Sequence, residues 1–494
     1  MNPTDRKDDL FKLAELYGVQ PSYTDLEGRV RTAGSEAVIR VLKALGAPVE
    51  SEKDASEAIR ECERRIGGNC VEPVIISSDG GPVEIRLRIP EHPADDGREC
   101  RIEISAMDGG TVRRFRFSLG QAPTEQRERM GDDLFAIKRV ILKSGLPFGY
   151  YNLKVELGDT TADSLIVSAP SSLSASLEKE RSWGVFLPLY SLHSRRSWGI
   201  GDFSDLSDLV EWTGSKGGST VGILPILSSF LSHDSAPEQP FDYSPYAPAS
   251  RLFWNEIFVD VEAVPDLADC PSARKILESR EFQSELSRLR QAEYVDYKGV
   301  YSLKRRVLLE LSRCLRRADS RRGAEFRSYL ENHPDVADYA RFRAVGDREG
   351  KPWQMWRRPL RDGTISEGDY DSEIADFYAY GQWIAEEQLT SVKDRSETAG
   401  VGLYLDMPLG VHSSSYDIYR ERECFVLDVS AGAPPDPLAV EGQDWRFPPL
   451  NHFQLRRHRY RYFIAALRHH LEYARVLRLD HAAGFHRLYL VPHG

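Results

Sequence analysis

The sequence has no apolar run long enough to form a membrane-spanning helix. Such a helix needs about 18 to 20 consecutive apolar residues, and charged residues, which make up 29% of the 494 positions, interrupt every long stretch. The first nine residues are polar and lack the apolar segment of a signal peptide. We therefore expect a cytoplasmic protein that is not inserted in a membrane.

Cysteine is scarce, and its spacing is not that of a metal site. None of the six cysteines belongs to a C-x-x-C pair or stands at ligand spacing from a histidine; they are Cys62, Cys70, Cys100, Cys270, Cys314 and Cys424. The twelve histidines include no H-x-x-x-H pair with an acidic partner on a predicted helix. We expect reduced thiols, as in most cytoplasmic proteins, and no bound metal.

Positive charge is also in deficit. The formal net charge is −11 at pH 7. Nucleic acids and anionic membranes are polyanions, so neither would be attracted to this protein. The charge balance favours a neutral substrate.

The first third of the chain divides into two regions with different periodicity. Residues 1–70 have apolar positions at helical spacing and predict a small helical segment. From residue 71 to about 170 the period changes to two, as in residues 83–89, which predicts a β-sandwich. Later strands of this sandwich are expected at 137–142 and 151–157, on either side of a glycine- and proline-containing turn.

Strands and helices alternate in the third region, residues 181–494, after a serine-rich linker at 168–176. This alternation predicts an α/β fold with a parallel sheet and crossover helices. Short apolar strands are expected at 183–189, 221–227, 401–405 and 475–479. A long helical insertion, at about 264–398, separates the second strand from the third.

The end of the fourth expected strand carries the strongest candidate site. Arg478 and Asp480 stand two residues apart, so both side chains point to the same side of an extended strand. A carboxylate at the C-terminal rim of a barrel strand indicates catalysis. The structural alternative is an arginine–aspartate pair that only closes the end of the strand.

Motifs at the ends of the expected strands together resemble one enzyme family. The motifs are SWGIGDF at 197–203, FDYSPY at 241–246, LYLDMPLGV at 403–411, RLDHAAGF at 478–485, and a loop with GAPPD, GQDW and PPL between 432 and 450. In this order they resemble the 4-alpha-glucanotransferases, the amylomaltases or disproportionating enzymes of the alpha-amylase clan. The resemblance implies a (β/α)8 TIM barrel that transfers segments of α-1,4-glucans between maltooligosaccharides without cofactor or metal.

The resemblance also implies roles for individual residues. By position, Asp480 corresponds to the nucleophile and Arg478 to the arginine that hydrogen-bonds it, while Asp406 and Tyr246 correspond to residues that hold the donor sugar. A retaining exchange needs a carboxylate to form a glycosyl-enzyme ester, and a second carboxyl about 5–5.5 Å away as acid and then base. We expect further substrate contacts from Trp445, Pro435, Asp436, His481 and Trp198, with core packing as the alternative for Trp198.

The sequence departs from the family pattern further along. In the resembled enzymes an acid/base glutamate follows the fourth strand in a Glu-Asp-Leu-Gly context, and a His-Asp pair lies beyond it; the sequence has neither. We therefore expect an N-terminal fragment with half of the barrel, inactive by itself. Two other functions stay open: a retaining α-glucan hydrolase of the same clan, and a non-catalytic glycan-binding protein. The loop at 432–450 favours transfer, because a covered site excludes water.

Overall fold

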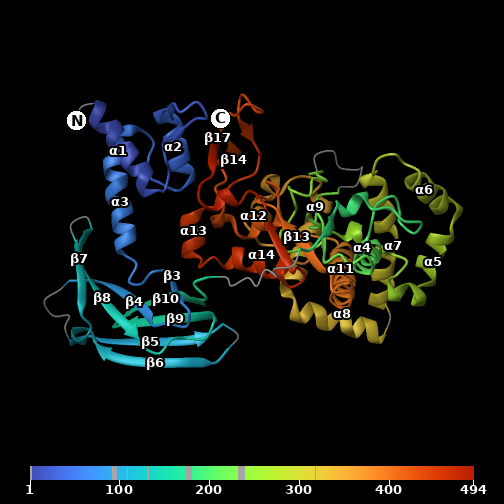
Figure 1. Ribbon diagram of the computed structural model, residues 1–494, viewed down its shortest axis with the longest axis horizontal. Coiled ribbons are helices and arrows are strands. Elements are labelled where there is room, and N and C mark those ends of the chain that lie inside the picture. Colours follow the sequence, from blue (N-terminus) through green and yellow to red (C-terminus); the bar gives the residue numbers. More distant parts are fainter. Residues whose placement is uncertain are drawn as a thin grey trace.

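The computed structural model describes residues 3–91, 97–107, 109–130, 133–172, 181–231, 240–317 and 319–493. Its elements form three groups along the chain: N-terminal helices, a pair of β-sheets, and a parallel sheet surrounded by helices (Figure 1).

The N-terminal group contains three helices and one hairpin. The helices are α1 (Pro3–Leu16), α2 (Ser35–Ala44) and α3 (Ala55–Gly67). The predicted helical segment did not include the hairpin between α1 and α2, where β1 (Ser22–Thr24) and β2 (Val30–Thr32) pair antiparallel around a turn. Their exposed side chains show no apolar periodicity that would have indicated strands.

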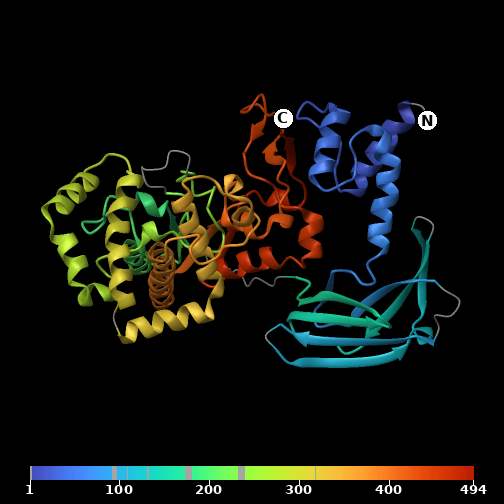
Figure 2. The same ribbon diagram turned by 180° about the vertical axis from the view of Figure 1, so that it is seen from behind.

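The core of the N-terminal helices is shared with the C-terminal part of the chain. Leu10, Leu13 and Leu42 are fully buried in one cluster with Val426 and Val429. Helix α2 lies beside β17 (Tyr489–Pro492), so the N-terminal group contacts the last strand of the described chain (Figure 2).

The second group is two facing sheets. The larger has the order β3 (Val74–Ser78), β10 (Thr160–Ala169), β9 (Gly149–Leu157), β5 (Glu99–Ala106), β6 (Thr111–Ser118). The smaller has the order β4 (Val83–Pro90), β8 (Asp133–Leu142), β7 (Thr124–Met130). Alternate residues of β4 are buried, and Ile85 and Leu87 meet Ile102 and Leu153 of the other sheet in one core.

The turn between β8 and β9 crosses from one sheet to the other, because these two strands belong to different sheets. Gly145 lies in this turn, and a Cβ there would stand 1.5 Å from the carbonyl oxygen of Gly80, so only glycine fits. Of the expected linker at 168–176, residues 168 and 169 end β10, whereas residues 173–176 lie outside the described part of the chain.

The third group is built on a four-stranded, all-parallel sheet. The strands β11 (Gly184–Phe186), β12 (Thr220–Gly222), β13 (Gly402–Met407) and β16 (Val476–Leu479) are neighbours in chain order. All four occur where apolar runs predicted strands. The first two are shorter than expected, since Pro188 and Pro225 lie in the predicted runs and proline cannot donate to a sheet.

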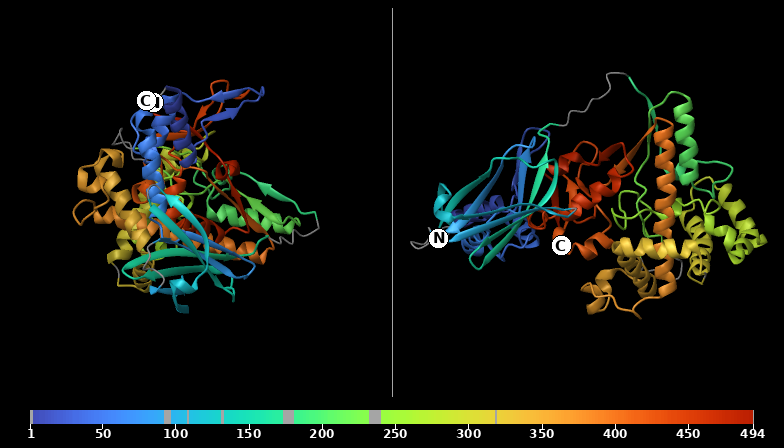
Figure 3. Two further views of the ribbon diagram at one scale, coloured as in Figure 1. Left: turned by 90° about the vertical axis from the view of Figure 1, so that its left-hand side faces the viewer. Right: turned by 90° about the horizontal axis from the view of Figure 1, so that it is seen from below.

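Helices connect the four strands. Helix α4 (Phe203–Ser215) follows β11 and begins with a capping box, in which Asp202 accepts from the N–H of Asp205. Helix α14 (Arg461–Leu471) precedes β16, and the long helix α11 (Ser372–Thr398) precedes β13 and packs along α4 (Figure 3).

The insertion between β12 and β13 is helical, as expected. Before α11 it contains α5 (Pro271–Glu278), α6 (Arg280–Arg290), α7 (Tyr297–Arg317), α8 (Arg321–Asn332), α9 (Pro334–Glu349) and α10 (Arg358–Arg361). Among the helices of the described ranges, none is both long and apolar enough to cross a membrane.

A small antiparallel sheet holds the loop that follows β13. It consists of β14 (Val429–Ala433), paired on one side with β15 (Gln443–Asp444) and on the other with β17. In the chain, helix α12 (Tyr416–Arg420) precedes β14, and helix α13 (His452–Arg457) follows β15.

Candidate active site

A cavity of about 890 Å³ opens where β13 and β16 end. Parallel strands present their carboxyl ends at one edge of the sheet, so the loops that follow them converge there. Five residues predicted from the sequence line the cavity: Tyr246, Trp445, Arg478, Asp480 and His481.

Arg478 connects two aspartates at this edge. In the parallel register Asp406 on β13 lies opposite Arg478 on β16. Nη1 of Arg478 donates to both carboxylate oxygens of Asp406, at 2.7 and 2.6 Å, and Nη2 donates to Oδ1 of Asp480 at 2.9 Å. The hydroxyl of Tyr246 donates to Asp406 Oδ2 at 2.8 Å. A carboxylate beneath the cavity therefore fixes the arginine that contacts Asp480.

Hydrogen bonding and burial together explain the electrostatics of this cluster. The side chain of Asp406 has no exposed surface, whereas that of Arg478 is 38% exposed and that of Asp480 is 27% exposed. The hydrogen bond to Asp406 raises the pKa of Arg478 well above its usual range, so the guanidinium is always charged. Burial, and then the bond to Asp406, raise the pKa of Tyr246 to about 12, so its hydroxyl remains a donor near neutral pH.

Backbone hydrogen bonds align the two loops that carry these residues. The N–H of His412 donates to the carbonyl of Pro248 at 3.0 Å, and that of Tyr416 donates to Ala249 at 2.8 Å. The buried guanidinium of Arg251 also donates to the carbonyl of Leu409. The loop after β13 is thereby held beside the segment that contains Tyr246.

Trp445 and His481 form one wall of the cavity. Their rings meet edge to face, with centroids 4.9 Å apart. The indole N–H of Trp445 donates to Gln443 at 2.9 Å, and its backbone N–H donates to Ala431 at 2.9 Å. The small sheet therefore positions the tryptophan, whose ring is suited to the apolar C–H faces of a sugar.

Three expected substrate contacts lie elsewhere. The expectation for Trp198 is wrong, because the side chain is 2% exposed, donates to Glu262 at 2.9 Å and packs against Phe282. Pro435 and Asp436 do not line the cavity. Asp436 instead accepts from the backbone N–H groups two and three residues ahead and fixes the turn of its loop.

Several cavity residues were not predicted, among them Asp242, Ser244, His412 and Phe447. Asp242 and Ser244 belong to the FDYSPY motif, and His412 directly follows the LYLDMPLGV motif. Their nearness to the motifs was the only signal for them in the sequence.

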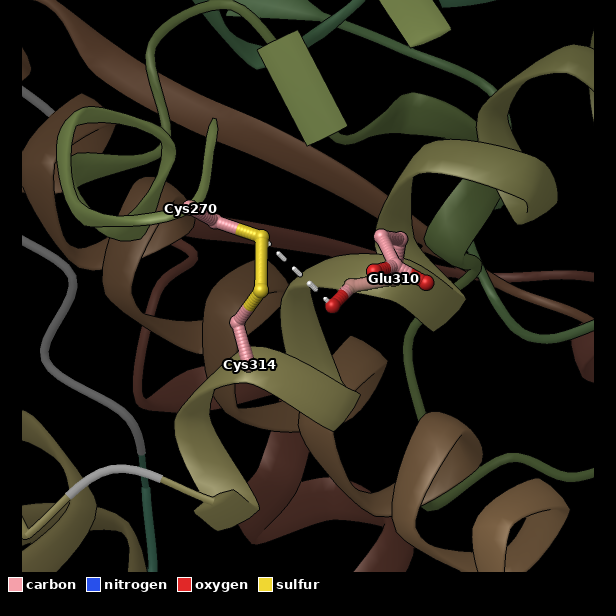
Figure 4. Close-up of side chains that lie close together, drawn as sticks. All are labelled: Cys270, Glu310 and Cys314. Atoms are coloured by element: carbon pink, nitrogen blue, oxygen red, sulfur yellow. Dashed lines mark hydrogen bonds between the residues drawn. A yellow bond between two sulfur atoms is a disulfide. The ribbon is translucent and has the colours of Figure 1, made fainter. Parts of the chain in front are cut away.

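One pair of cysteines contradicts the expectation of reduced thiols. Cys270, before α5, and Cys314, on α7, form a disulfide with Cα atoms 5.9 Å apart (Figure 4). Glu310, one turn earlier on α7, is close enough to join them in a metal site. The sulfur–sulfur bond leaves no free thiolate, so this cluster is not a metal site in the oxidised protein. The two cysteines are 44 residues apart, so their pairing could not be predicted from the sequence.

The fold and the cavity define an α/β protein with a carboxylate site at the carboxyl edge of a parallel sheet. Residues 187–494 match the profile of the 4-alpha-glucanotransferase family, and residues 70–170 match that of the MalQ N-terminal beta sandwich domain. The chain belongs to the 4-alpha-glucanotransferase family, as the motifs predicted, and is an enzyme of this type.

Individual members of the family align with nearly the whole of this chain. A 4-alpha-glucanotransferase of Mycobacterium bovis is 30% identical over 99% of this chain and 68% of its own length. One of Haemophilus influenzae is 27% identical over 99% of this chain and 67% of its own. The crystal structure of amylomaltase from Corynebacterium glutamicum superposes with a TM-score of 0.81 and 26% identity, over 98% of this chain and 67% of that one.

Proposed function

We propose that the protein transfers α-1,4-glucan segments between maltooligosaccharides by a retaining double displacement, with Asp480 as the nucleophile. The observation that carries this proposal is the position of Asp480. Its carboxylate faces the cavity and receives one hydrogen bond from Arg478, which Asp406 holds from below.

The first step breaks the donor's glycosidic bond. Asp480 attacks the anomeric carbon, an ester forms, and the leaving glucan takes up a proton from a general acid. Oδ1 of Asp480 accepts from Arg478, whereas Oδ2 accepts no hydrogen bond from the described residues and is available for the attack. In the second step an acceptor hydroxyl attacks the anomeric carbon of the ester, the bond to Asp480 breaks and frees its carboxylate, and the hydroxyl proton passes to the conjugate base of the general acid.

Asp406 and Tyr246 have different parts in this scheme. Tyr246 lines the cavity, where its ring would contact the donor sugar. The Asp406 carboxylate is buried, so it acts through Arg478 and Tyr246 as a positioning residue. Trp445 and His481 provide the wall against which a glucose ring lies.

The parallel sheet fits the proposed barrel. Its four strands are neighbours in chain order with helices between them, which is the arrangement of consecutive strands in a (β/α)8 barrel. The division into a helical segment at 1–70, a sandwich at 71–170 and a barrel region at 181–494 accompanies this proposal.

Product analysis tests the reaction. Because residues 1–494 are expected to be inactive by themselves, a form of the protein that also carries the acid/base glutamate of the family pattern is incubated with maltotriose, and the products are resolved by chromatography. Chains longer than the substrate, together with glucose, are expected from transfer. Products that are all shorter than maltotriose would show hydrolysis instead.

A glycosyl fluoride tests the nucleophile separately. Fluoride leaves without protonation, so α-maltotriosyl fluoride forms the ester whether or not a general acid is in place. Intact-mass and peptide spectrometry should find one maltotriosyl group on the peptide that contains Asp480. Asp480→Asn should not be labelled, whereas Asp436→Asn, a carboxylate outside the cavity, should be labelled like the wild type. Labelling of Asp480→Asn at the wild-type rate would refute the assignment.

A further inference from the structure

The loop after β13 places a histidine in the cavity wall with one nitrogen engaged and one free. Nδ1 of His412 accepts the backbone N–H of Ser414 at 3.0 Å. The ring also meets Phe230, with centroids 5.1 Å apart. Nε2 makes no hydrogen bond with any residue in the described ranges. His412 is half-buried and lines the cavity, so Nε2 is the ring nitrogen that remains to meet a ligand there.

The hydrogen bond to Ser414 determines the tautomer of His412. An acceptor nitrogen carries no proton, so the proton of the neutral ring is on Nε2. Burial lowers the pKa of the ring, and the negative charge of Asp242 opposes this only in part. His412 thus presents a neutral N–H donor to the cavity.

Asp242 provides an acceptor in the same cavity. Its Oδ1 accepts the N–H of Ser244 at 2.8 Å, and its backbone N–H donates to Phe230, which also contacts His412. Its other oxygen has no partner among the described residues. Neighbouring hydroxyls of a pyranose can each donate and accept, so one neutral donor and one carboxylate acceptor are complementary to such a pair.

We infer that His412 and Asp242 form a sugar-binding subsite, in which His412 Nε2–H donates to one hydroxyl of a bound glucosyl unit and Asp242 accepts from a neighbouring hydroxyl. This inference rests on the proposed function, because it requires a glucan in the cavity. It implies that His412 makes the subsite selective for a glucosyl unit in which both of these neighbouring hydroxyls are unsubstituted.

Two substitutions separate sugar binding from loop structure. In His412→Asn, the side-chain oxygen occupies the place of Nδ1 and keeps the bond to Ser414, but the Nε2 donor is lost. In His412→Gln, the amide N–H occupies the place of Nε2, but the acceptor for Ser414 is lost. A residue that only stabilises the loop would tolerate the first change better than the second.

Calorimetric titration with maltotriose is the test, because binding does not depend on turnover. His412→Asn should weaken the Kd about 10-fold, the effect of one neutral hydrogen bond, at an unchanged Tm. His412→Gln should stay within about 3-fold of the wild-type Kd and lose Tm. Asp242→Asn keeps an acceptor for Ser244 and should weaken the Kd several-fold.

Deoxy analogues of maltotriose complete the experiment. The wild type should bind the analogue that lacks the hydroxyl bound by His412 more weakly than it binds maltotriose. His412→Asn should bind this analogue no more weakly than it binds maltotriose. Wild-type affinity in His412→Asn would overturn the inference. Failure of the wild type to be labelled by the glycosyl fluoride would refute the proposed nucleophile instead, and it would leave the binding result unchanged.

Discussion

Replacement of Asp406 should disturb the site more than any other change beneath the cavity. Asp406→Ala removes the acceptor of two hydrogen bonds from Arg478 and one from Tyr246. The guanidinium then loses its buried partner and remains attached only to Asp480. We expect both a less stable catalytic region and a displaced nucleophile.

The size of the effect follows from burial. Removal of one partner of a buried ion pair costs about 3–5 kcal/mol. Because the Arg478 side chain is 38% exposed and can reach water, the lower end, about 3 kcal/mol, applies to Asp406→Ala. Asp406→Asn retains the shape and one acceptor oxygen, so about 1–2 kcal/mol is expected. At roughly 2 °C per kcal/mol for a large domain, these losses lower the apparent Tm by about 6 °C and about 3 °C.

Thermal unfolding and labelling by α-maltotriosyl fluoride measure the two consequences. The labelling rate should fall about 100-fold in Asp406→Ala, the usual cost of a misplacement of about 1 Å. Asp208→Ala is the matched control, because Asp208 forms a 2.6 Å ion pair with Arg196 in which both side chains are more than half exposed. An exposed pair contributes at most about 1 kcal/mol. If Asp406→Ala shifted Tm no more than this control and were labelled normally, Asp406 would not position Arg478.

Three further perturbations have defined outcomes. The pKa of Tyr246 is raised to about 12. The stability that its hydroxyl adds is therefore full below about pH 10 and is lost as pH rises through about 12. The difference in Tm between the wild type and Tyr246→Phe should vanish over that window. Burial lowers the pKa of His470 to about 4. The stability that the neutral ring adds to the folded protein is therefore full above about pH 6.5 and is lost as pH falls through about 4. In His470→Asn, the Tm should fall less steeply on the acid side of its pH dependence. The disulfide between Cys270 and Cys314 closes a long loop, worth about 4 kcal/mol by chain entropy; a thiol reductant should lower the Tm of the wild type but not that of the double serine variant.

The sequence was sufficient for the parts of the fold that depend on local pattern. Apolar runs of β propensity located all four parallel strands, and the period-two alternation of residues 83–89 located a strand of the sandwich. The hairpin at 22–32 was missed, because its strands of three residues are mostly exposed and have no buried face to set a period.

Contacts between distant segments could not be predicted from the sequence. The spacing of Arg478 and Asp480 predicted that their side chains lie on one side at the end of the strand, but not that Arg478 also pairs with Asp406. That pairing depends on the register of β13 and β16, which are separated by about 70 residues. For the same reason the sequence left both a substrate contact and core packing open for Trp198, because Glu262 and Phe282, which contact it, are distant in the sequence.

The charges at the carboxyl edge of the sheet suit the proposed chemistry. In the proposed reaction Arg478, Asp406 and Asp480 together carry one positive and two negative charges, and the partly exposed Asp480 would face the anomeric carbon, whereas Asp406 is buried. The transition state of glycosyl transfer is oxocarbenium-like and gains positive charge at that carbon. The buried carboxylate of Asp406 offsets the positive charge of Arg478. The arginine therefore reduces the negative potential of Asp480 at the anomeric carbon less than it would alone. Without Asp406 the full charge of Arg478 would be directed at the nucleophile and would weaken its attraction for the developing cation.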